Sequence, residues 1–321
     1  MAPAATAWFD GPVAWDERGG PPTPEVTALV GPTASGKSAL AQRLALASGD
    51  LEIVTVDSMQ VYRGMDIGTA KPSSVDQSLV RHHLLDVADP SEDFSLARFL
   101  PAARAVLADI ASRDGRALLV GGTGLYVQAL VDDLEVPGRY PEARAALDEV
   151  DDTPSLHSRL ATLDPLAAAR MEPTNRRRVV RALEVTIGSG RPFSSFGPGF
   201  EAYPPSPVRQ VGLRVPLEEL DRRIVARVEA MVAGGLLEEV AVLAARPGLS
   251  ATARQAIGYR ELLAHLEGTS SLEEATALTV ARTRRLARRQ IRWFRRDPRI
   301  RWVDIGDNPL PDLASVLGDS A

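Results

Sequence analysis

A glycine-rich segment that ends in a lysine and a serine is the clearest source of chemistry in the sequence. It fits the pattern G-x-x-x-x-G-K-S and reads Gly31-Pro32-Thr33-Ala34-Ser35-Gly36-Lys37-Ser38. In this pattern backbone N–H groups converge on phosphate oxygens, the lysine adds a full positive charge, and the serine hydroxyl can ligate magnesium. We therefore expect all eight residues to bind phosphate, with Ser38 as a ligand of Mg²⁺.

This motif indicates a phosphate site but not a reaction. Kinases and ATPases with such a loop usually hold the magnesium with an acidic residue at the end of a further apolar strand. Here the apolar run 117–120 ends in Gly121-Gly122, although Asp57 could take that role. A diphosphate leaving group would need the same cradle, so phosphoryl transfer and transfer of another group both stay open.

The elements that must position these residues alternate between strand and helix. Apolar runs at 26–30, 52–56 and 117–120 are separated by helical patterns at 38–47 and about 96–112. Such alternation predicts an α/β fold, a P-loop NTPase-like parallel sheet flanked by helices. Ligands of these sheets gather at the carboxyl ends of the strands. We therefore expect Asp57 and Thr123 to lie near the phosphate loop.

A change of pattern predicts a second domain. Short helices bounded by prolines occupy 135–207, and a strand candidate returns at 208–215. This indicates a small all-helical domain, 135–207, inserted into a core made of 25–134 and 208–321. Helices follow up to a last strand at 302–305. Residues 1–24, rich in Gly, Pro and Ala, are interpreted as a flexible N-terminal extension.

Composition excludes several classes of protein. The chain is 45% apolar and 25% charged, which is typical of a globular protein. No uncharged apolar run is long enough to cross a membrane, and no secretory signal pattern opens the chain. The absence of cysteine excludes disulfides and thiolate chemistry. We expect a cytoplasmic protein without a membrane partner, and nothing in the sequence requires more than a monomer.

Basic residues gather in two places although the net charge is −5. Ten of the residues 282–301 are arginine, against a single acidic residue, and arginines recur there at every fourth position. A second cluster, 176–178 with Arg181, lies in the predicted insertion. Charge of this density favours contacts with nucleic-acid phosphates. An aromatic such as Trp293 could stack a base, but a core position fits it better.

Further segments, taken together with the phosphate loop, resemble the bacterial tRNA isopentenyltransferase (tRNA dimethylallyltransferase) family in order over roughly residues 25 to 305. These segments are Asp57-Ser58-Met59-Gln60-Val61-Tyr62-Arg63, Gly64-Met65-Asp66-Ile67-Gly68-Thr69-Ala70-Lys71-Pro72, His82-His83-Leu84-Leu85-Asp86, Gly121-Gly122-Thr123-Gly124-Leu125-Tyr126, Arg181-Ala182-Leu183-Glu184-Val185, Gln255-Ala256-Ile257-Gly258-Tyr259-Arg260 and Arg289-Gln290-Ile291-Arg292-Trp293-Phe294-Arg295. Two features depart from the family pattern: residues 1–24, and Arg292 where a small polar residue is usual.

The resemblance implies transfer of a dimethylallyl group from dimethylallyl diphosphate to the exocyclic N6 amine of the adenine just 3′ of the anticodon, with release of diphosphate. The implied partners are the tRNA anticodon stem-loop and dimethylallyl diphosphate, and the implied cofactor is Mg²⁺. An adenine amine is a poor nucleophile, so a carboxylate that takes its proton accelerates the reaction. Asp57 is the candidate general base. The resemblance also indicates Arg223 as a diphosphate ligand and Thr123 as a further active-site residue.

The tRNA contacts expected from this resemblance come from both predicted domains. They are Asp57, Ser58, Met59, Gln60, Thr123, Arg144, Arg177, Arg178, Arg181, Gln255, Arg260, Arg288, Arg289, Gln290, Trp293 and Arg295. Ser58 and Gln60 are expected to read the edge of an adenine that is splayed out of the RNA loop. Three of the set, Arg144, Gln255 and Arg260, rest on the resemblance alone.

Other functions stay open on the sequence. An adenylate isopentenyltransferase acting on free nucleotides shares the chemistry, but so small an acceptor needs neither an arginine-rich segment nor a helical insertion. A P-loop kinase or ATPase is consistent with the loop alone, and a non-catalytic RNA-binding module is consistent with the arginines. The pair His82-His83 is interpreted as structural hydrogen bonding, because adjacent side chains point in different directions.

Overall fold

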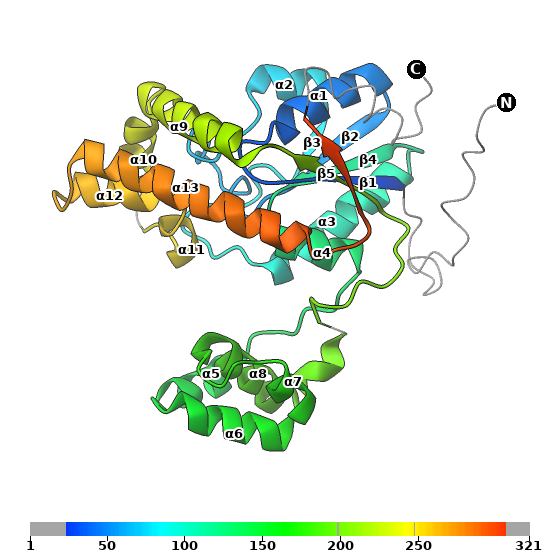
Figure 1. Cartoon of the computed structure of the whole chain (residues 1–321), viewed down its shortest axis with the longest axis vertical. Coiled ribbons are helices and arrows are strands. Elements are labelled where there is room, and N and C mark those ends of the chain that lie inside the picture. Colours follow the sequence, from blue (N-terminus) through cyan, green and yellow to red (C-terminus); the bar gives the residue numbers. More distant parts are fainter. Residues whose placement is uncertain (1–23, 198, 247, 306–321) are drawn as a thin grey trace. The chain divides into compact units, whose positions relative to one another are not determined.

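The computed structural model describes residues 24–197, 199–246 and 248–305. All but the last residue of the predicted N-terminal extension, 1–24, lies outside the described residues. The chain divides into two compact units (Figure 1), of which the smaller comprises Asp132–Pro204 and the larger the chain before and after it. The insertion expected from the sequence, 135–207, covers nearly the same residues as the smaller unit.

The larger unit is built on one parallel sheet whose strand order is β3-β2-β4-β1-β5-β6. Its strands are β1 (Glu25–Val30), β2 (Leu51–Val56), β3 (His82–His83), β4 (Arg116–Gly121), β5 (Arg209–Arg214) and β6 (Ile300–Asp304). Each neighbouring pair runs parallel. This confirms the expected fold class of a parallel sheet flanked by helices. The two-residue strand β3 was not expected, because it is too short to show a periodic pattern.

The register of three central strands brings their following loops together. Gly121 at the end of β4 pairs with Val30 at the end of β1 and with Val56 at the end of β2. All three strands therefore end at one level of the sheet. The loops that begin at Gly31, Asp57 and Gly122 leave the sheet side by side, at its carboxyl edge.

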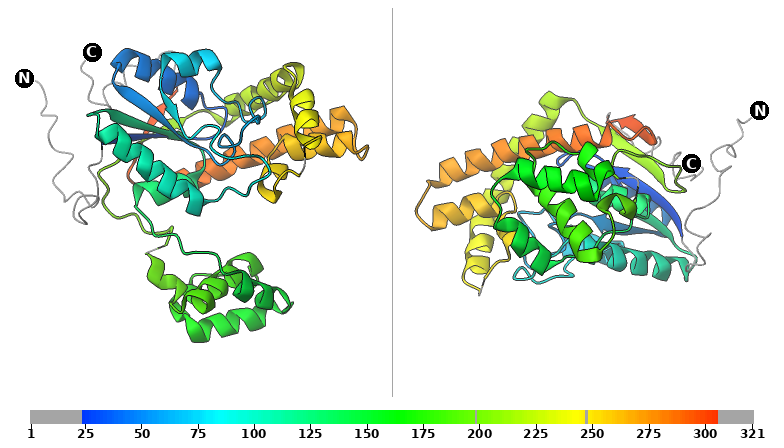
Figure 2. Two further views of the ribbon diagram at one scale, coloured as in Figure 1. Left: turned by 180° about the vertical axis from the view of Figure 1, so that it is seen from behind. Right: turned by 90° about the horizontal axis from the view of Figure 1, so that it is seen from below.

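Helices cover both faces of the sheet. The helices of the larger unit are α1 (Lys37–Ser48), α2 (Ser74–Leu79), α3 (Leu96–Ala111), α4 (Gly124–Val131), α9 (Leu217–Ala233), α10 (Leu236–Ala244), α11 (Ala251–Arg254), α12 (Tyr259–Leu266) and α13 (Leu272–Phe294). Helices α1 and α2 lie on one face, and α3 and α4 on the other (Figures 1 and 2). Leu40 and Leu44 of α1 pack with Ile53 and Leu118 of the sheet in one apolar cluster. Burial of such side chains is the main source of stability for the layer.

The smaller unit is entirely helical in its described residues, as the sequence predicts. It consists of α5 (Pro141–Asp148), α6 (Thr153–Leu163), α7 (Pro165–Ala169), α8 (Arg176–Ser189) and the 3₁₀-helix η1 (Phe193–Phe196). Prolines stand in the first turns of α5, α6 and α7, where a missing N–H costs no helical hydrogen bond. Its core is formed by Leu147, Leu156, Leu160, Val180 and Leu183 among others.

Across the described residues of both units, no helix has the length and the apolar composition that crossing a bilayer would require.

Candidate active site and arginine-rich face

A cavity of about 260 Å³ opens at the carboxyl edge of the sheet, where the loops after β1, β2 and β4 meet. Its walls also include one residue each from α9 and α13. The lining residues are Thr33, Ala34, Gly36, Lys37, Ser38, Ala39, Asp57, Gln60, Thr69, Ala70, Val120, Gly121, Gly122, Arg227 and Gln290. The predicted phosphate loop and the candidate base Asp57 thus lie in the same cavity.

The phosphate loop has the geometry of an anion cradle. Gly36 has φ 92°, a conformation that glycine adopts without strain, and it precedes the first residue of α1. The amide groups at the start of α1 therefore face the cavity with the positive end of the helix dipole. The Ser35 side-chain hydroxyl is buried and has no hydrogen-bond partner among the described residues.

Two cations and one carboxylate set the charge of the cavity. Burial lowers the pKa of Lys37 to about 8, the nearby Arg227 lowers it as well, and Asp57 opposes both. Desolvation likewise lowers the pKa of Arg227, again opposed by Asp57. The Lys37 ammonium donates a hydrogen bond to the carbonyl of Pro32 at 2.8 Å. With Lys37 and Arg227 both charged, the cavity has an excess of positive charge, which suits a diphosphate.

Asp57 is fixed by the turn that it begins. Its Oδ1 accepts the backbone N–H of Met59 at 2.8 Å and that of Gln60 at 3.3 Å. Thr123 lies next to this turn, since its Oγ1 accepts the backbone N–H of Ser58 at 3.3 Å. Thr123 is not among the lining residues, whereas Gly122 before it is. The structure thus brings Asp57 into the cavity and Thr123 beside it.

Gln290 of α13 links two of the loops. Its Oε1 accepts the N–H of Thr33 at 2.8 Å, and its Nε2 donates to the carbonyl of Gly122 at 2.9 Å. A Cβ on Gly122 would lie 2.5 Å from that Nε2, so a larger residue there would displace the Gln290 amide. Both ends of this amide are thus occupied by backbone groups of the protein. The residue was expected to contact tRNA, and the geometry shows it holding the phosphate loop to the loop after β4.

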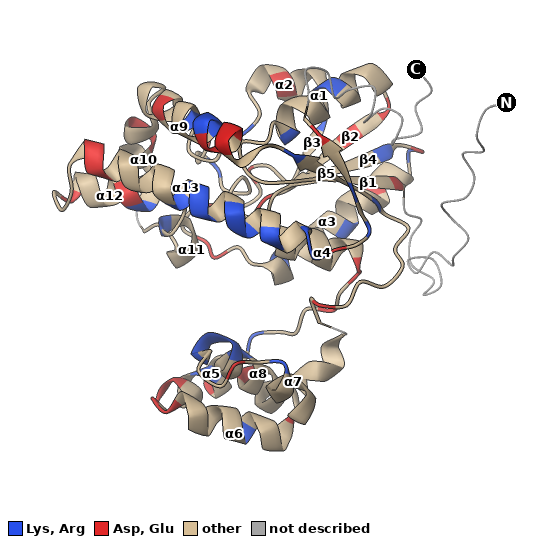
Figure 3. Ribbon diagram, in the orientation of Figure 1, with Lys and Arg blue, Asp and Glu red and all other residues tan. Residues whose placement is uncertain are grey.

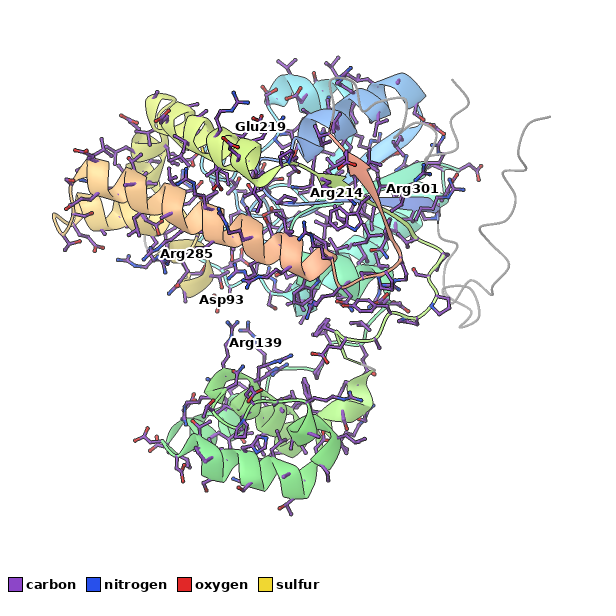
Figure 4. The ribbon with its side chains drawn as sticks, viewed as in Figure 1. Asp93, Arg139, Arg214, Glu219, Arg285 and Arg301 are labelled. Carbon is purple, nitrogen blue, oxygen red and sulfur yellow. The ribbon has the colours of Figure 1, made fainter. Side chains whose placement is uncertain are left out.

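Two arginines on one face of α9 differ in position. Arg227 lines the cavity, and Arg223, one turn earlier, does not. Arg223 Nε instead donates to Glu219 Oε1 at 2.6 Å, and its side chain is 37% exposed. Glu219 is labelled on α9 in Figure 4. The sequence showed both arginines at helical spacing, but the resemblance indicated only Arg223 as a diphosphate ligand.

Positive charge gathers on the C-terminal half of α13, from residue 282 onward (Figure 3), and Arg285 in this half is labelled in Figure 4. A shallow cavity of about 360 Å³ lies on this face, lined by Leu217, Arg285, Arg288, Ile291, Arg292 and Arg295. Arg288 also binds both carboxylate oxygens of Asp221, at 2.7 and 3.1 Å. We call the exposed arginines 285, 288, 289, 292 and 295 the arginine-rich face.

Trp293, between these arginines, packs against the protein. A Cβ on Gly124 would lie 2.3 Å from Trp293 Cδ1, so the indole lies directly on the start of α4. The Arg296 guanidinium lies 4.5 Å from the centroid of its ring. Trp293 is half-buried rather than part of the core, and this packing favours a structural position over a role in stacking a base.

The remaining predicted contacts in the helical unit fall into two groups. Arg144 Nε donates to Asp148 at 2.8 Å, and Arg181 donates to Glu184 at 2.6 Å and to the carbonyls of Pro137 and Gly138. These guanidinium groups are thus engaged within the unit. The side chains 177 and 178 are exposed at the start of α8, which leaves them accessible to a phosphate backbone.

Around α11 and α12, Gln255 is exposed, and Arg260 pairs with the buried Glu261 at 3.3 Å.

The histidine pair 82–83 is engaged in hydrogen bonds. His82 Nδ1 bonds with the carbonyl of Val80 at 2.9 Å, and His83 Nε2 bonds with Glu52 at 2.6 Å. This is the structural bonding that the sequence indicated for the pair.

The oxygen donors that face the cavity fit a hard cation. Ser38 and Asp57 both line it, which places one hydroxyl and one carboxylate within the same site. Mg²⁺ in phosphate sites takes few protein ligands and completes its octahedron with phosphate oxygens and waters. The described residues hold no group of three or more His, Cys, Asp or Glu arranged for a metal. A magnesium ion here would therefore depend on the bound phosphates as well as on Ser38.

The sequence assigned no role in the site to several lining residues, among them Thr69, Ala70 and Arg227. The first two belong to the segment G-M-D-I-G-T-A-K, which was quoted for the resemblance without a role in the site. Arg227 stands four residues after Arg223, and the resemblance indicated a role only for Arg223. For each of these residues the sequence shows the residue type and the neighbouring motif. It does not show whether the residue faces the cavity in the folded protein.

Comparison with protein families places most of the chain in one group. The family model described as IPP transferase matches residues 60–297, and a model described as Isopentenyl transferase matches 24–88. A protein of Kineococcus radiotolerans named tRNA dimethylallyltransferase is 50% identical over 92% of this chain and 96% of its own. One of Geobacter metallireducens with the same name is 47% identical over 92% of this chain and 98% of its own.

Solved structures give the same grouping. The tRNA isopentenylpyrophosphate transferase of Bacillus halodurans is 36% identical, covers 92% of this chain and 97% of its own, and superposes with a TM-score of 0.67. A eukaryotic dimethylallyltransferase described as acting on tRNA is 26% identical over 89% of this chain and 75% of its own, with a TM-score of 0.74.

Proposed function

The chain belongs to the IPP transferase family, and we propose on that premise that it transfers a dimethylallyl group from dimethylallyl diphosphate to tRNA. The acceptor in this proposal is the exocyclic N6 amine of the adenine just 3′ of the anticodon. Relatives named tRNA dimethylallyltransferase that align with nine-tenths of the chain support this activity over a free-nucleotide acceptor and over a kinase or ATPase.

One observation supports the chemistry most directly. A single cavity holds Lys37 and Arg227, which can bind a diphosphate, together with Asp57, which can accept a proton. A prenyl transfer needs these two functions next to each other, because the leaving group and the nucleophile meet at one carbon atom. A phosphate-binding loop alone would account for the first function but not for the second.

The proposed step balances without any further reactant. The amine lone pair forms a bond to C1 of the dimethylallyl group, and the C1–O bond breaks with its electron pair going to the diphosphate. The amine proton passes to the Asp57 carboxylate, a transfer that contributes roughly 10²- to 10⁴-fold to the rate. Lys37, Arg227 and the amides at the start of α1 stabilise the charge that develops on the departing oxygen.

Magnesium, assembly state and location are further parts of the proposal. Mg²⁺ held by Ser38 and the phosphate oxygens would neutralise charge on the diphosphate, as the donor set of the cavity permits. We propose that the enzyme works as a monomer in the cytoplasm. The exposed arginines 177 and 178 of the helical unit and those of the arginine-rich face are proposed to bind the phosphates of the anticodon stem-loop.

A labelling experiment tests the activity. The purified chain is incubated with Mg²⁺, dimethylallyl diphosphate labelled in the prenyl group, and tRNA that lacks the modification, with AMP and ATP in parallel reactions. We expect label in the tRNA, at the adenine beside the anticodon, and none in the nucleotides. Label on AMP alone would indicate the free-nucleotide activity, and steady release of phosphate from ATP without labelled RNA would indicate an ATPase.

A further inference from the structure

The carboxylate of Glu239 lies outside the cavity. It binds backbone N–H groups of the loop 66–70, which forms one wall of the cavity. Glu239 lies on α10, and its Oε2 accepts the N–H groups of Asp66 and Ile67, both at 2.8 Å. Its Oε1 accepts the N–H of Gly68 at 3.1 Å and the hydroxyl of Tyr259 at 2.5 Å. Consecutive amides of one loop therefore converge on a single side chain that is distant in the sequence.

Tyr259 supports this arrangement from α12. Its side chain is fully buried. Burial, together with the hydrogen bond to Glu239, raises the pKa of the phenol, so it stays protonated and keeps donating. Gly68 lies against the ring, and a Cβ there would be 2.4 Å from Tyr259 Cε2. The loop is thus held by α10 through hydrogen bonds and by α12 through close packing.

The two residues that follow this anchored segment reach the cavity. Thr69 and Ala70 both line it. Their carbonyl groups accept the side-chain amide of Gln60, at 3.0 and 3.2 Å. Gln60 also lines the cavity, and its backbone N–H donates to Asp57 Oδ1 at 3.3 Å. A continuous chain of hydrogen bonds and backbone therefore runs from Glu239 to the turn that holds the candidate base.

Lys71 fixes the other end of the loop. Its ammonium contacts Asp66 and Asp86, each at 2.5 Å, and the carbonyl of Tyr62 at 2.6 Å. These contacts hold the loop to the segment after β3, whereas Glu239 holds it to the helices that follow β5. Glu239 is not among the residues that line the cavity, so any effect on the reaction must pass through the loop.

We propose that Glu239 is a positioning residue for the acceptor, which holds the loop 66–70 so that Gln60 and Asp57 meet the nucleic-acid base in the orientation required for transfer. This inference rests on the proposed function. The diphosphate side of the cavity is formed by Lys37, Arg227 and the phosphate loop, none of which Glu239 contacts in the structure. Loss of Glu239 is therefore expected to affect the acceptor selectively.

The central test is Glu239→Gln, which keeps the size of the side chain but replaces one acceptor oxygen by an NH₂ group. That NH₂ group faces backbone N–H donors and cannot accept from them. Since small misplacements remote from the reacting atoms can cost about 10²-fold, we expect kcat/KM for tRNA to fall by about that factor. Affinity for inorganic pyrophosphate should stay at the wild-type value. The matched control is Glu238→Gln, the same change at the exposed neighbour on α10, which should leave both quantities unchanged.

Further variants separate positioning from general stability. Tyr259→Phe removes only the hydroxyl that supports Glu239 and is expected to lower kcat/KM for tRNA by less than Glu239→Gln does. Glu239→Asp restores the carboxylate and should recover part of the lost activity. Hydrogen exchange of the amides 66–68 should accelerate in Glu239→Gln while exchange at the phosphate loop is unaltered.

These experiments distinguish failure of the inference about Glu239 from failure of the proposed function on which it rests. Wild-type tRNA kinetics in Glu239→Gln would overturn the inference alone, provided the wild type labels tRNA. A parallel loss of tRNA kinetics, pyrophosphate affinity and melting temperature would also overturn it, because Glu239 would then be a general stabilising residue. If the wild type leaves tRNA unlabelled, the proposed function fails, and the inference fails with it.

Discussion

At the residue scale, Asp57 lines the cavity with only one of its two carboxylate oxygens bound to other groups of the described protein. Oδ1 accepts two backbone N–H groups, and none of the described residues donates to Oδ2. An aspartate that only capped the following turn would need no more than this. Its place in one cavity with Lys37 and Arg227 is what distinguishes a base from a cap.

The substitution Asp57→Asn tests that distinction. An asparagine keeps Oδ1 as an acceptor for the turn but cannot take a proton, so we expect kcat for labelled transfer to fall by about 10²- to 10⁴-fold. Affinity for tRNA, measured by fluorescence anisotropy, should change little. If binding of tRNA and activity were lost together, Asp57 would be a residue that shapes the loop rather than the base.

Lys37 gives the site a dependence on pH. Its pKa in the free protein is lowered to about 8, chiefly by burial. The charged ammonium, which binds an anion, is therefore present below that pH and is lost above it. Affinity for pyrophosphate should fall as the pH rises past about 8, by at most about tenfold per pH unit.

Calorimetric titrations of the wild type and of Lys37→Arg between pH 7 and pH 10 would measure this effect, in a window of about one to two pH units on either side of the lowered pKa. The guanidinium stays charged throughout, and the titration of pyrophosphate itself affects both proteins alike. The ratio of the two affinities isolates the lysine. A ratio that does not change with pH would contradict the lowered pKa.

At the scale of elements, the strands that build the site could be predicted closely and its side walls could not. Strands β1, β2 and β4 differ from the expected apolar runs by at most one residue at either end. The agreement is close because buried parallel strands are continuous apolar runs, which the sequence shows directly. The wall at Thr69 and Ala70 depends on Glu239, which is 173 residues from Asp66 in the sequence. No local pattern reports a contact of that separation.

The helix α9 shows the same limit. Spacing places Arg223 and Arg227 on one face, but only the packing of the helix decides which guanidinium reaches the cavity. We expect Arg227→Gln to weaken pyrophosphate binding by about 1.5–3 kcal/mol, the contribution of hydrogen bonds to a charged group. Arg223→Gln, which removes the same charge one turn away, should cost less. An equal or larger loss in Arg223→Gln would show that Arg223 leaves Glu219 to bind the anion, as the family resemblance indicates.

At the scale of the whole molecule, a net charge of −5 has to be reconciled with the proposed binding of a polyanion. The acidic residues are spread over the surface, while exposed arginines are concentrated on α13 and at the start of α8 (Figure 3). Salt dependence reports such local contacts, because each phosphate neutralised by the protein releases counterions. It therefore measures which arginines meet RNA, independently of the average charge.

Removing arginines in pairs tests both units together. Arg177→Gln with Arg178→Gln in the helical unit, and Arg292→Gln with Arg295→Gln on the arginine-rich face, should each reduce the slope of log K for tRNA against log salt by about 2. The four changes combined should reduce it by about 4 if the two units contact RNA independently. The control pair, Arg214→Gln with Arg301→Gln, alters the net charge equally on β5 and β6 (Figure 4) and should leave the slope unchanged. If the pair in the helical unit behaved like this control, that unit would not bind the RNA backbone through these arginines. The arginines that contact tRNA phosphates would then lie on the larger unit alone.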